Sequence, residues 1–224
     1  MISVQGINKS FGDNQVLFDV SAVFNTGDVN MIIGRSGSGK TVLLKTIIGL
    51  HEPDSGKVFF NDRDFTASKF KEKKKLRQEI GMVFQGGALF TSLSVQENIL
   101  LPLNMFSDMN KAEKLKRVDF CLERVNMKGI NNLFPSELSG GMQKRVAIAR
   151  AIALNPKYLV CDEPNSGLDP QTSILIDQLI REITIEYKMT TIVNTHDMNS
   201  VMEIGDNVLF IYQGKMWWEG TKNT

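Results

Sequence analysis

The stretch Gly34-Arg35-Ser36-Gly37-Ser38-Gly39-Lys40-Thr41 decides the fold of this chain. It fits the pattern G-x-x-x-x-G-K-[ST], in which glycines let successive backbone N–H groups turn inward toward phosphate oxygens. An apolar run at 29–33 precedes it and a helical pattern at 41–48 follows, so the helix N-terminus adds partial positive charge. The setting predicts a phosphate-binding loop rather than a chance glycine-rich turn. Lys40 is expected to reach the β- and γ-phosphates of a nucleotide, and the Thr41 hydroxyl to ligate Mg²⁺.

The composition is that of an ordinary globular protein. The chain has 224 residues, 42% of them hydrophobic, and a formal net charge of +1. A near-neutral charge gives no general nucleic-acid footprint. The apolar runs are far shorter than the ~18 residues of a membrane span, and the N-terminus lacks the basic and apolar regions of an export signal. Cys121 and Cys161 are too few for a disulfide framework. These features predict a cytosolic protein.

Strand and helix patterns alternate along the chain and predict a mostly parallel sheet covered by helices. Strands are expected at 16–24, 29–33, 57–60, 80–84, 158–161, 190–194, 208–212 and 216–219. Between about 86 and 155 the pattern is helical, which predicts a helical insertion in the sheet domain. The basic run at 69–77 is interpreted as a solvated helix face in preference to a lipid- or nucleic-acid-binding patch.

Two further polar groups follow predicted strands. Asp162 and Glu163 come directly after the apolar run 158–161, and His196 follows the strand at 190–194. Ligands of open α/β sheets bind at the carboxyl ends of the strands, so these residues are expected beside the phosphate loop. Asp162 would hold Mg²⁺ through its hydration shell, since this cation prefers oxygen ligands and retains waters. Glu163 would orient or deprotonate the attacking water.

With these motifs the chain resembles the ATPase subunits of ABC transporters, over essentially all of its length. The matching motifs are the phosphate loop Gly34–Thr41, the adenine-stacking aromatic Phe11, the Q-loop glutamine Gln85, the signature Leu138–Gln143, the carboxylates Asp162 and Glu163, the D-loop Ser166–Asp169, and the switch histidine His196. The resemblance implies a single ABC ATPase domain over 1–224 of the α/β class. Its P-loop NTPase (RecA-like) core would occupy about 1–85 and 156–224, with an N-terminal antiparallel β subdomain. The inserted α-helical signature subdomain would occupy about 86–155.

The resemblance also implies how ATP and Mg²⁺ would be used. Glu163, His196 and Gln85 would be catalytic, while Thr41, Gln85 and Asp162 would serve the metal. A homodimer would form head to tail, so that Ser139, Gly140 and Gly141 of one copy face the γ-phosphate bound by the other. A helix N-terminus and a serine hydroxyl suit an anion.

The segment Phe84–Val95 resembles the Q-loop region of Mla-type ATPases, which move phospholipids between the membranes of a Gram-negative envelope. This implies a peripheral position on the cytoplasmic face of the plasma membrane and an integral-membrane permease as partner. A lipid-binding substrate-binding protein is a further candidate partner, and no nucleic acid is expected. Asn165 and Asn194-Thr195 depart from the commoner residues of the family. A C-terminal tail that could brace the dimer is expected to be missing.

Other functions remain open under the same mechanism, namely lipoprotein extraction, cell-division coupling or solute import. A soluble ABC ATPase acting on ribosomes or DNA is disfavoured, since such proteins carry two cassettes in one chain or a long coiled coil. An inactive regulatory module is disfavoured because Lys40, Asp162, Glu163 and His196 are all present.

Overall fold

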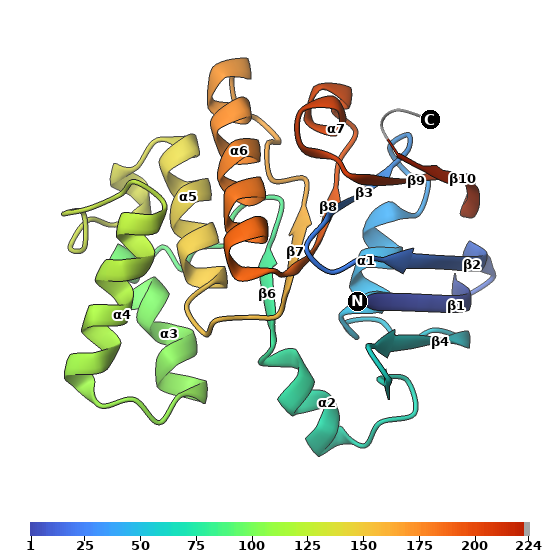
Figure 1. Ribbon diagram of the computed structural model, residues 1–224, viewed down its shortest axis with the longest axis horizontal. Helices are drawn as coiled ribbons and strands as arrows, with labels where there is room; N and C mark the ends of the chain where they lie inside the picture. Colours follow the sequence, from blue (N-terminus) through green and yellow to red (C-terminus); the bar gives the residue numbers. More distant parts are fainter. Residues whose placement is uncertain (222–224) are drawn as a thin grey trace.

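A six-stranded sheet lies at the centre of the computed structural model, which describes residues 1–221 (Figure 1). Its strand order is β10-β9-β3-β8-β7-β6. The bounds are Val29–Ile33 for β3, Ile80–Val83 for β6, Tyr158–Asp162 for β7, Thr190–Asn194 for β8, Asn207–Tyr212 for β9 and Lys215–Gly220 for β10. Strands β6, β7, β8, β3 and β9 pair in parallel, and β10 pairs antiparallel with β9. The central strands β7 and β8 are buried throughout, as expected of parallel strands covered on both faces.

A second, antiparallel sheet has the order β2-β1-β4-β5. It consists of β1 (Ile2–Phe11), β2 (Asn14–Phe24), β4 (Ser55–Phe60) and β5 (Arg63–Asp64). Helix α1 (Lys40–Ile47) joins the two sheets, because Leu43, Leu44 and Ile47 belong to one buried cluster with residues of both. The antiparallel β subdomain implied by the resemblance is therefore present, and it packs against the helix that follows the phosphate loop.

Three helices and a short turn separate β6 from β7 in the chain. They are α3 (Val95–Phe106), α4 (Lys111–Arg124), the 3₁₀ turn η1 (Pro135–Glu137) and α5 (Gly140–Ala151). Ser94 and Asn110 cap α3 and α4, each with a glutamate three residues later that bonds back to the cap. All three helices fall inside the stretch predicted as a helical insertion, and Figure 1 shows them beyond the edge strand β6. The division into subdomains at about 86 and 155 stays a prediction.

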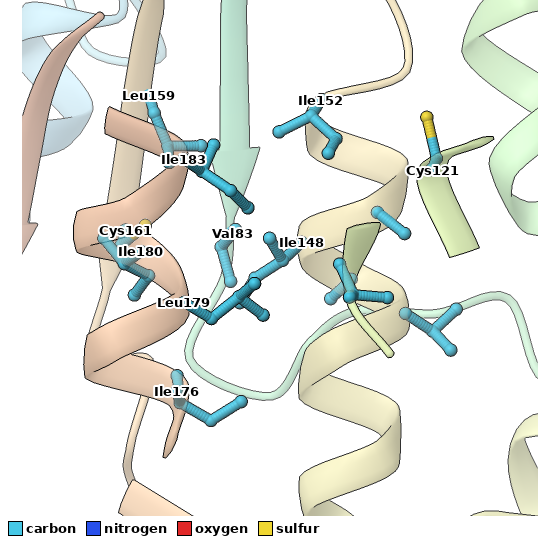
Figure 2. Packing of buried hydrophobic residues seen from close by; sticks show 14 of the residues in the cluster. Val83, Cys121, Ile148, Ile152, Leu159, Cys161, Ile176, Leu179, Ile180 and Ile183 are labelled. Carbon is cyan, nitrogen blue, oxygen red and sulfur yellow. The ribbon is translucent and has the colours of Figure 1, made fainter. Parts of the chain in front are cut away.

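Helix α5 is tied to the sheet by apolar packing against α6 (Pro170–Tyr187) and β6. Figure 2 shows Ile148 of α5 near Leu179 of α6, with Val83 at the end of β6. The cluster extends through Ile152 and Ile183, and all of these side chains are almost fully buried. Tight packing of this kind transmits displacement rather than absorbing it. The N-terminus of α5 therefore keeps a defined position relative to the edge of the sheet.

The remaining helices are α2 (Phe70–Arg77) and α7 (Met198–Ile204). Helix α2 carries the basic run, and its charged residues are largely exposed while Leu76 is buried, which agrees with a solvated face. Helix α7 follows His196 directly and was not predicted. Among residues 1–221, no helix combines the length and the apolar character needed to span a membrane.

Candidate nucleotide-binding site

The phosphate loop connects β3 to α1 in a conformation that requires glycine. Gly34, Gly37 and Gly39 have φ angles of 149°, 79° and 102°. A Cβ atom on Gly34 would lie 2.2 Å from the carbonyl oxygen of Ile211, so a side chain there would displace the neighbouring strand β9. The loop is closed by a hydrogen bond from the Ser38 N–H to the Arg35 carbonyl at 3.1 Å. Backbone crowding and dihedral strain together explain why this curved loop carries glycines.

The Lys40 side chain lies along this loop and is 6% exposed. Its Nζ donates to the carbonyl oxygens of Gly34 at 2.9 Å and Arg35 at 3.2 Å. Burial lowers the pKa of Lys40, while the nearby carboxylates of Glu163 and Asp162 oppose that shift. The amine is thus held against the backbone of the loop, where a phosphate oxygen would replace the carbonyl contacts with a stronger, charge-assisted one.

Three polar side chains meet behind the loop. Thr41 Oγ1 donates to Asp162 Oδ1 at 3.2 Å, and Asn194 Nδ2 donates to Thr41 Oγ1 at 3.1 Å and to Asp162 Oδ1 at 2.5 Å. The parallel register sets Asp162 of β7 directly opposite Asn194 of β8. Asp162 and Asn194 are 5% and 0% exposed. Three elements therefore place a hydroxyl and a carboxylate side by side at one edge of the sheet.

These oxygens fit Mg²⁺, which takes oxygen ligands and keeps several waters. No trio of His, Cys, Asp or Glu side chains in residues 1–221 is grouped to hold a metal on its own. A site with one hydroxyl and one carboxylate is what Mg²⁺ uses when the substrate phosphates supply the remaining ligands. Thr41 would hold the ion directly and Asp162 through a water.

Glu163 and His196 form a close pair at the same edge. His196 Nδ1 lies 2.7 Å from Glu163 Oε2. Glu163 has a φ of 49°, and its N–H donates to the Asn194 carbonyl at 2.9 Å, so the chain turns sharply as β7 ends. The Glu163 side chain is 12% exposed and that of His196 is 65% exposed. The histidine thus covers one oxygen of a largely buried carboxylate.

Most of the predicted residues line one cavity of about 710 Å³. The predicted residues in its wall are Gly34, Arg35, Ser36, Gly37, Gly39, Lys40, Thr41, Gln85, Glu163 and His196. Ser38 and Asp162 are not in the wall, although both adjoin residues that are. The volume is in the range of small-molecule and cofactor sites. The structure brings the phosphate loop and the residues after β6, β7 and β8 together, while the individual catalytic and binding roles stay predictions.

Gln85 also connects this cavity to the helical insertion. Its Nε2 donates to Ser166 Oγ at 3.4 Å, and its carbonyl oxygen accepts a hydrogen bond from Nζ of Lys144 in α5. Lys144 is 6% exposed, and burial lowers the pKa of its amine. This contact could not be predicted from the sequence, because a lysine in the helix after the signature has the pattern of a solvated residue and only the tertiary fold buries it.

Phe11 does not line the cavity. It is 46% exposed, and its ring meets that of His51 edge to face at a centroid distance of 5.2 Å. Lys9 Nζ lies 5.4 Å from the Phe11 ring centre. An exposed aromatic face at the end of β1 is compatible with stacking on a base, and this role for Phe11 stays a prediction.

The signature residues lie outside the cavity as well. Ser139, Gly140 and Gly141 begin α5, where Ser139 Oγ accepts from the Met142 N–H at 3.3 Å. Ser139 and the two glycines do not line the cavity that the phosphate loop of their own copy lines. Their contact with a γ-phosphate stays a prediction.

Comparison with known proteins places the chain in a family. A family model described as ABC transporter matches residues 17–166. The methionine import ATP-binding protein MetN of Geobacillus kaustophilus is 40% identical over 224 residues, which cover 98% of this chain and 65% of that protein. The probable ribonucleotide transport ATP-binding protein mkl of Mycobacterium tuberculosis (strain H37Rv) is 36% identical over 212 residues, covering 95% of this chain and 59% of that protein. The chain therefore spans less than two thirds of the length of either relative.

Two solved structures share the fold. The dimeric, post-hydrolysis ATP-binding cassette MJ0796, bound to ADP and Pi, superposes with a TM-score of 0.89 at 33% identity. That match covers 99% of this chain and 98% of the other. CbiO1 from Clostridium perfringens, part of the transporter complex cbiONQ, gives a TM-score of 0.89 at 32% identity, with 98% and 88% covered. The predicted α/β P-loop NTPase fold is confirmed, and the chain belongs to the ABC transporter family.

Proposed function

We propose that this chain is the ATP-hydrolysing subunit of an ABC transporter, acting as a homodimer beside an integral-membrane permease on the cytoplasmic face of the plasma membrane. The observation that carries the proposal is the Glu163–His196 pair, held at 2.7 Å in the wall of the cavity that Lys40 and Thr41 also line. A phosphate cradle alone would bind a nucleotide. A largely buried carboxylate beside it supplies a base for hydrolysis.

Binding would rest on the loop and its lysine. The backbone N–H groups of the loop and the N-terminus of α1 face the phosphates, and Lys40 exchanges its two carbonyl contacts for phosphate oxygens. Thr41 and Asp162 would hold Mg²⁺, which when bound neutralises charge on the β- and γ-phosphates. Gln85, in the wall of the cavity, would respond to the occupancy of the site.

Hydrolysis would rest on Glu163. His196 engages Oε2 of this carboxylate, which leaves Oε1 to accept a proton from the attacking water. The hydrogen bond from its own N–H to the Asn194 carbonyl fixes the backbone of Glu163, so the carboxylate is positioned before the water arrives. Each water deprotonated in this way attacks the γ-phosphorus, and ADP leaves with phosphate as the second product.

The second half of each site would come from the partner copy. The free N–H groups at the N-terminus of α5 and the Ser139 hydroxyl suit the γ-phosphate of the opposing copy. Closure then depends on the γ-phosphate, and its loss on hydrolysis separates the copies. The solved dimer of MJ0796, to which the chain is similar over nearly its full length, supports this arrangement.

The transported substrate is proposed to be a phospholipid, with a lipid-binding protein as accessory partner. The segment Phe84–Val95, with its resemblance to Mla-type ATPases, supports this choice. Solute import is the second candidate, and the 40% identical methionine import protein favours it.

The test is to purify the chain with its membrane partners from solubilised membranes and reconstitute the complex in proteoliposomes. ATP-dependent movement of a fluorescent phospholipid, lost in the Glu163→Gln complex, is the expected result. ATP-dependent uptake of labelled methionine without lipid movement would replace the phospholipid assignment by solute import. A complex that lacks ATPase activity altogether would overturn the proposed function.

A further inference from the structure

Asn194 occupies the end of β8 and is completely buried between the two residues expected to serve Mg²⁺. Its amide nitrogen donates to both Thr41 Oγ1 and Asp162 Oδ1. Its carbonyl oxygen on the main chain accepts the N–H of Glu163 at 2.9 Å. One residue thus contacts the hydroxyl, the carboxylate and the backbone of the expected base.

The hydrogen bonds around Thr41 leave one of its lone pairs available. A threonine hydroxyl has one proton to donate and two lone pairs. The proton goes to Asp162 Oδ1, and one lone pair accepts from Asn194. With these two directions fixed, the hydroxyl cannot rotate freely, and the remaining lone pair has a defined direction.

The carboxylate is ordered in the same way. Both hydrogen bonds that Asp162 receives from Thr41 and Asn194 end on Oδ1. Oδ2 is left to accept from a water bound to a cation. Because the amide donor is neutral, it orients the carboxylate without cancelling the negative charge that attracts the metal.

The buried amide of Asn194 also lowers the stability of the fold. Asn194 Oδ1 is buried and has no hydrogen-bond partner within the described part of the chain. An unsatisfied buried acceptor costs about 1–3 kcal/mol, and an apolar residue of similar size would avoid it. The two hydrogen bonds from its nitrogen to Thr41 and Asp162 therefore explain the amide better than packing does.

We propose that Asn194 is a positioning residue of the Mg²⁺ site, whose amide orients the Thr41 hydroxyl and the Asp162 carboxylate for a nucleotide-bound divalent cation. This inference rests on the proposed function. Outer-shell groups that orient ligands typically change metal affinity by about 10–100-fold when removed. Asn194 is completely buried and does not line the cavity, so affinity for the nucleotide without metal is expected to be unchanged.

The test compares the full chain with Asn194→Val, which keeps the bulk and removes the donor, and with Asn194→Ser, which keeps a smaller hydroxyl donor. Binding of a non-hydrolysable ATP analogue is first measured by calorimetry in EDTA. Mn²⁺ is then added stepwise, and its binding is followed by its EPR signal. The protein is held in excess over the analogue, so that all of the nucleotide is protein-bound. Asn194→Val is expected to raise the Mn²⁺ dissociation constant about tenfold, with a smaller rise in Asn194→Ser.

Asn30→Val is the matched control, because Asn30 is also a buried strand asparagine but bonds to the backbone of Asn25, Asp28 and Thr191. It should lower the melting temperature without changing the Mn²⁺ dissociation constant. An Mn²⁺ constant unchanged in both Asn194 variants overturns the inference, as does an equal rise in Asn30→Val. Absence of nucleotide binding by the unaltered chain in both EDTA and Mn²⁺ would instead overturn the proposed function.

Discussion

The imidazole Nδ1 of His196 lies 2.7 Å from Oε2 of Glu163, although the two residues end different strands of the sheet. The Glu163 side chain is 12% exposed and reaches the cavity wall beside Lys40. A carboxylate held on one oxygen by a histidine keeps its other oxygen for a proton, which is the arrangement a general base requires.

Glu163→Gln should therefore abolish turnover and leave nucleotide binding intact. The amide keeps the size of the side chain but cannot take up a proton, and loss of a general base typically costs about 10²–10⁴ in rate. Bound ATP that is not hydrolysed should hold two copies together, so the variant should elute as a dimer with ATP and as a monomer with ADP in size-exclusion chromatography. Normal ATP hydrolysis by this variant would show that Glu163 is not the base.

Lys40→Ala should weaken ATP binding itself. The amine sits on the carbonyls of Gly34 and Arg35, and its charge-assisted contact to phosphate is worth about 1.5–3 kcal/mol, or roughly 10–150-fold in affinity. Lys45→Ala, one turn further along α1, is the matched control and should bind ATP normally. Calorimetry with equal affinities for the two variants would contradict the assigned role of Lys40.

Gly34→Ala should disrupt the phosphate loop more than Gly37→Ala. Both glycines have positive φ, so alanine is strained at both positions. Only at Gly34 would the new Cβ meet neighbouring atoms, the Ile211 carbonyl oxygen at 2.2 Å and Ser38 Oγ at 2.8 Å. Gly34→Ala should lower both the melting temperature and ATP affinity, with a smaller effect for Gly37→Ala. Equal losses in the two variants would mean that strain, not crowding, sets the requirement.

The phosphate loop and the polar residues at the strand ends were predictable because each depends on a few neighbouring residues. Glycine spacing defines the loop, and Asp169 followed by Pro170 is a local pattern typical of a helix start, here that of α6. Strand β1 was not predicted, since Gly6 at a φ of 61° and several register shifts break its period-two pattern. Helix α7 was not predicted because its seven residues are too few to show a helical hydrophobic periodicity.

Contacts between distant elements could not be predicted in this way. The sequence marks Asn194 as unusual, but only the register between β7 and β8 places its amide on Asp162. Lys144 and Asp177 look like solvated helix residues, yet both are buried by the packing of α5 and α6. Buried polar residues of this kind can be recognised only once the tertiary fold is known.

Ser139→Arg should block hydrolysis while an isolated copy still binds ATP. Ser139 lies outside the cavity of its own chain, and a bulky cation there would prevent the partner copy from closing on its γ-phosphate. Because Ser139 also caps α5, Ser139→Ala serves as the control for the lost cap, worth about 1 kcal/mol. ATP binding is checked by calorimetry on dilute protein and turnover by phosphate release. An active Ser139→Arg variant would exclude the shared site.

Asp177→Asn should stabilise the protein most at alkaline pH. Asp177 of α6 is 2% exposed, and burial raises the pKa of its carboxyl to about 6, with Asp197 and Glu203 adding to the shift and hydrogen bonds from Ser200 and Asn165 opposing it. In the unfolded chain the pKa is near 3.8, so the folded state holds the proton more tightly. The contribution of the wild-type carboxyl to the free energy of unfolding is therefore fully present below about pH 4 and is lost as the pH rises through 6.

Asparagine does not titrate, so the difference in unfolding free energy between Asp177→Asn and wild type should be largest at pH 8. This free-energy difference should shrink between pH 6 and pH 4 by up to about 3 kcal/mol. The figure follows because folding raises the pKa by about two units, and each unit corresponds to about 1.4 kcal/mol. The oxygen of the new amide can still accept from Asn165, which donates to Asp177 at 2.7 Å in the wild type, so this hydrogen bond survives. Urea unfolding of both proteins at pH 8, 6 and 4.5 measures the difference directly. A difference that stays constant across this range would show that folding does not raise the pKa of the Asp177 carboxyl.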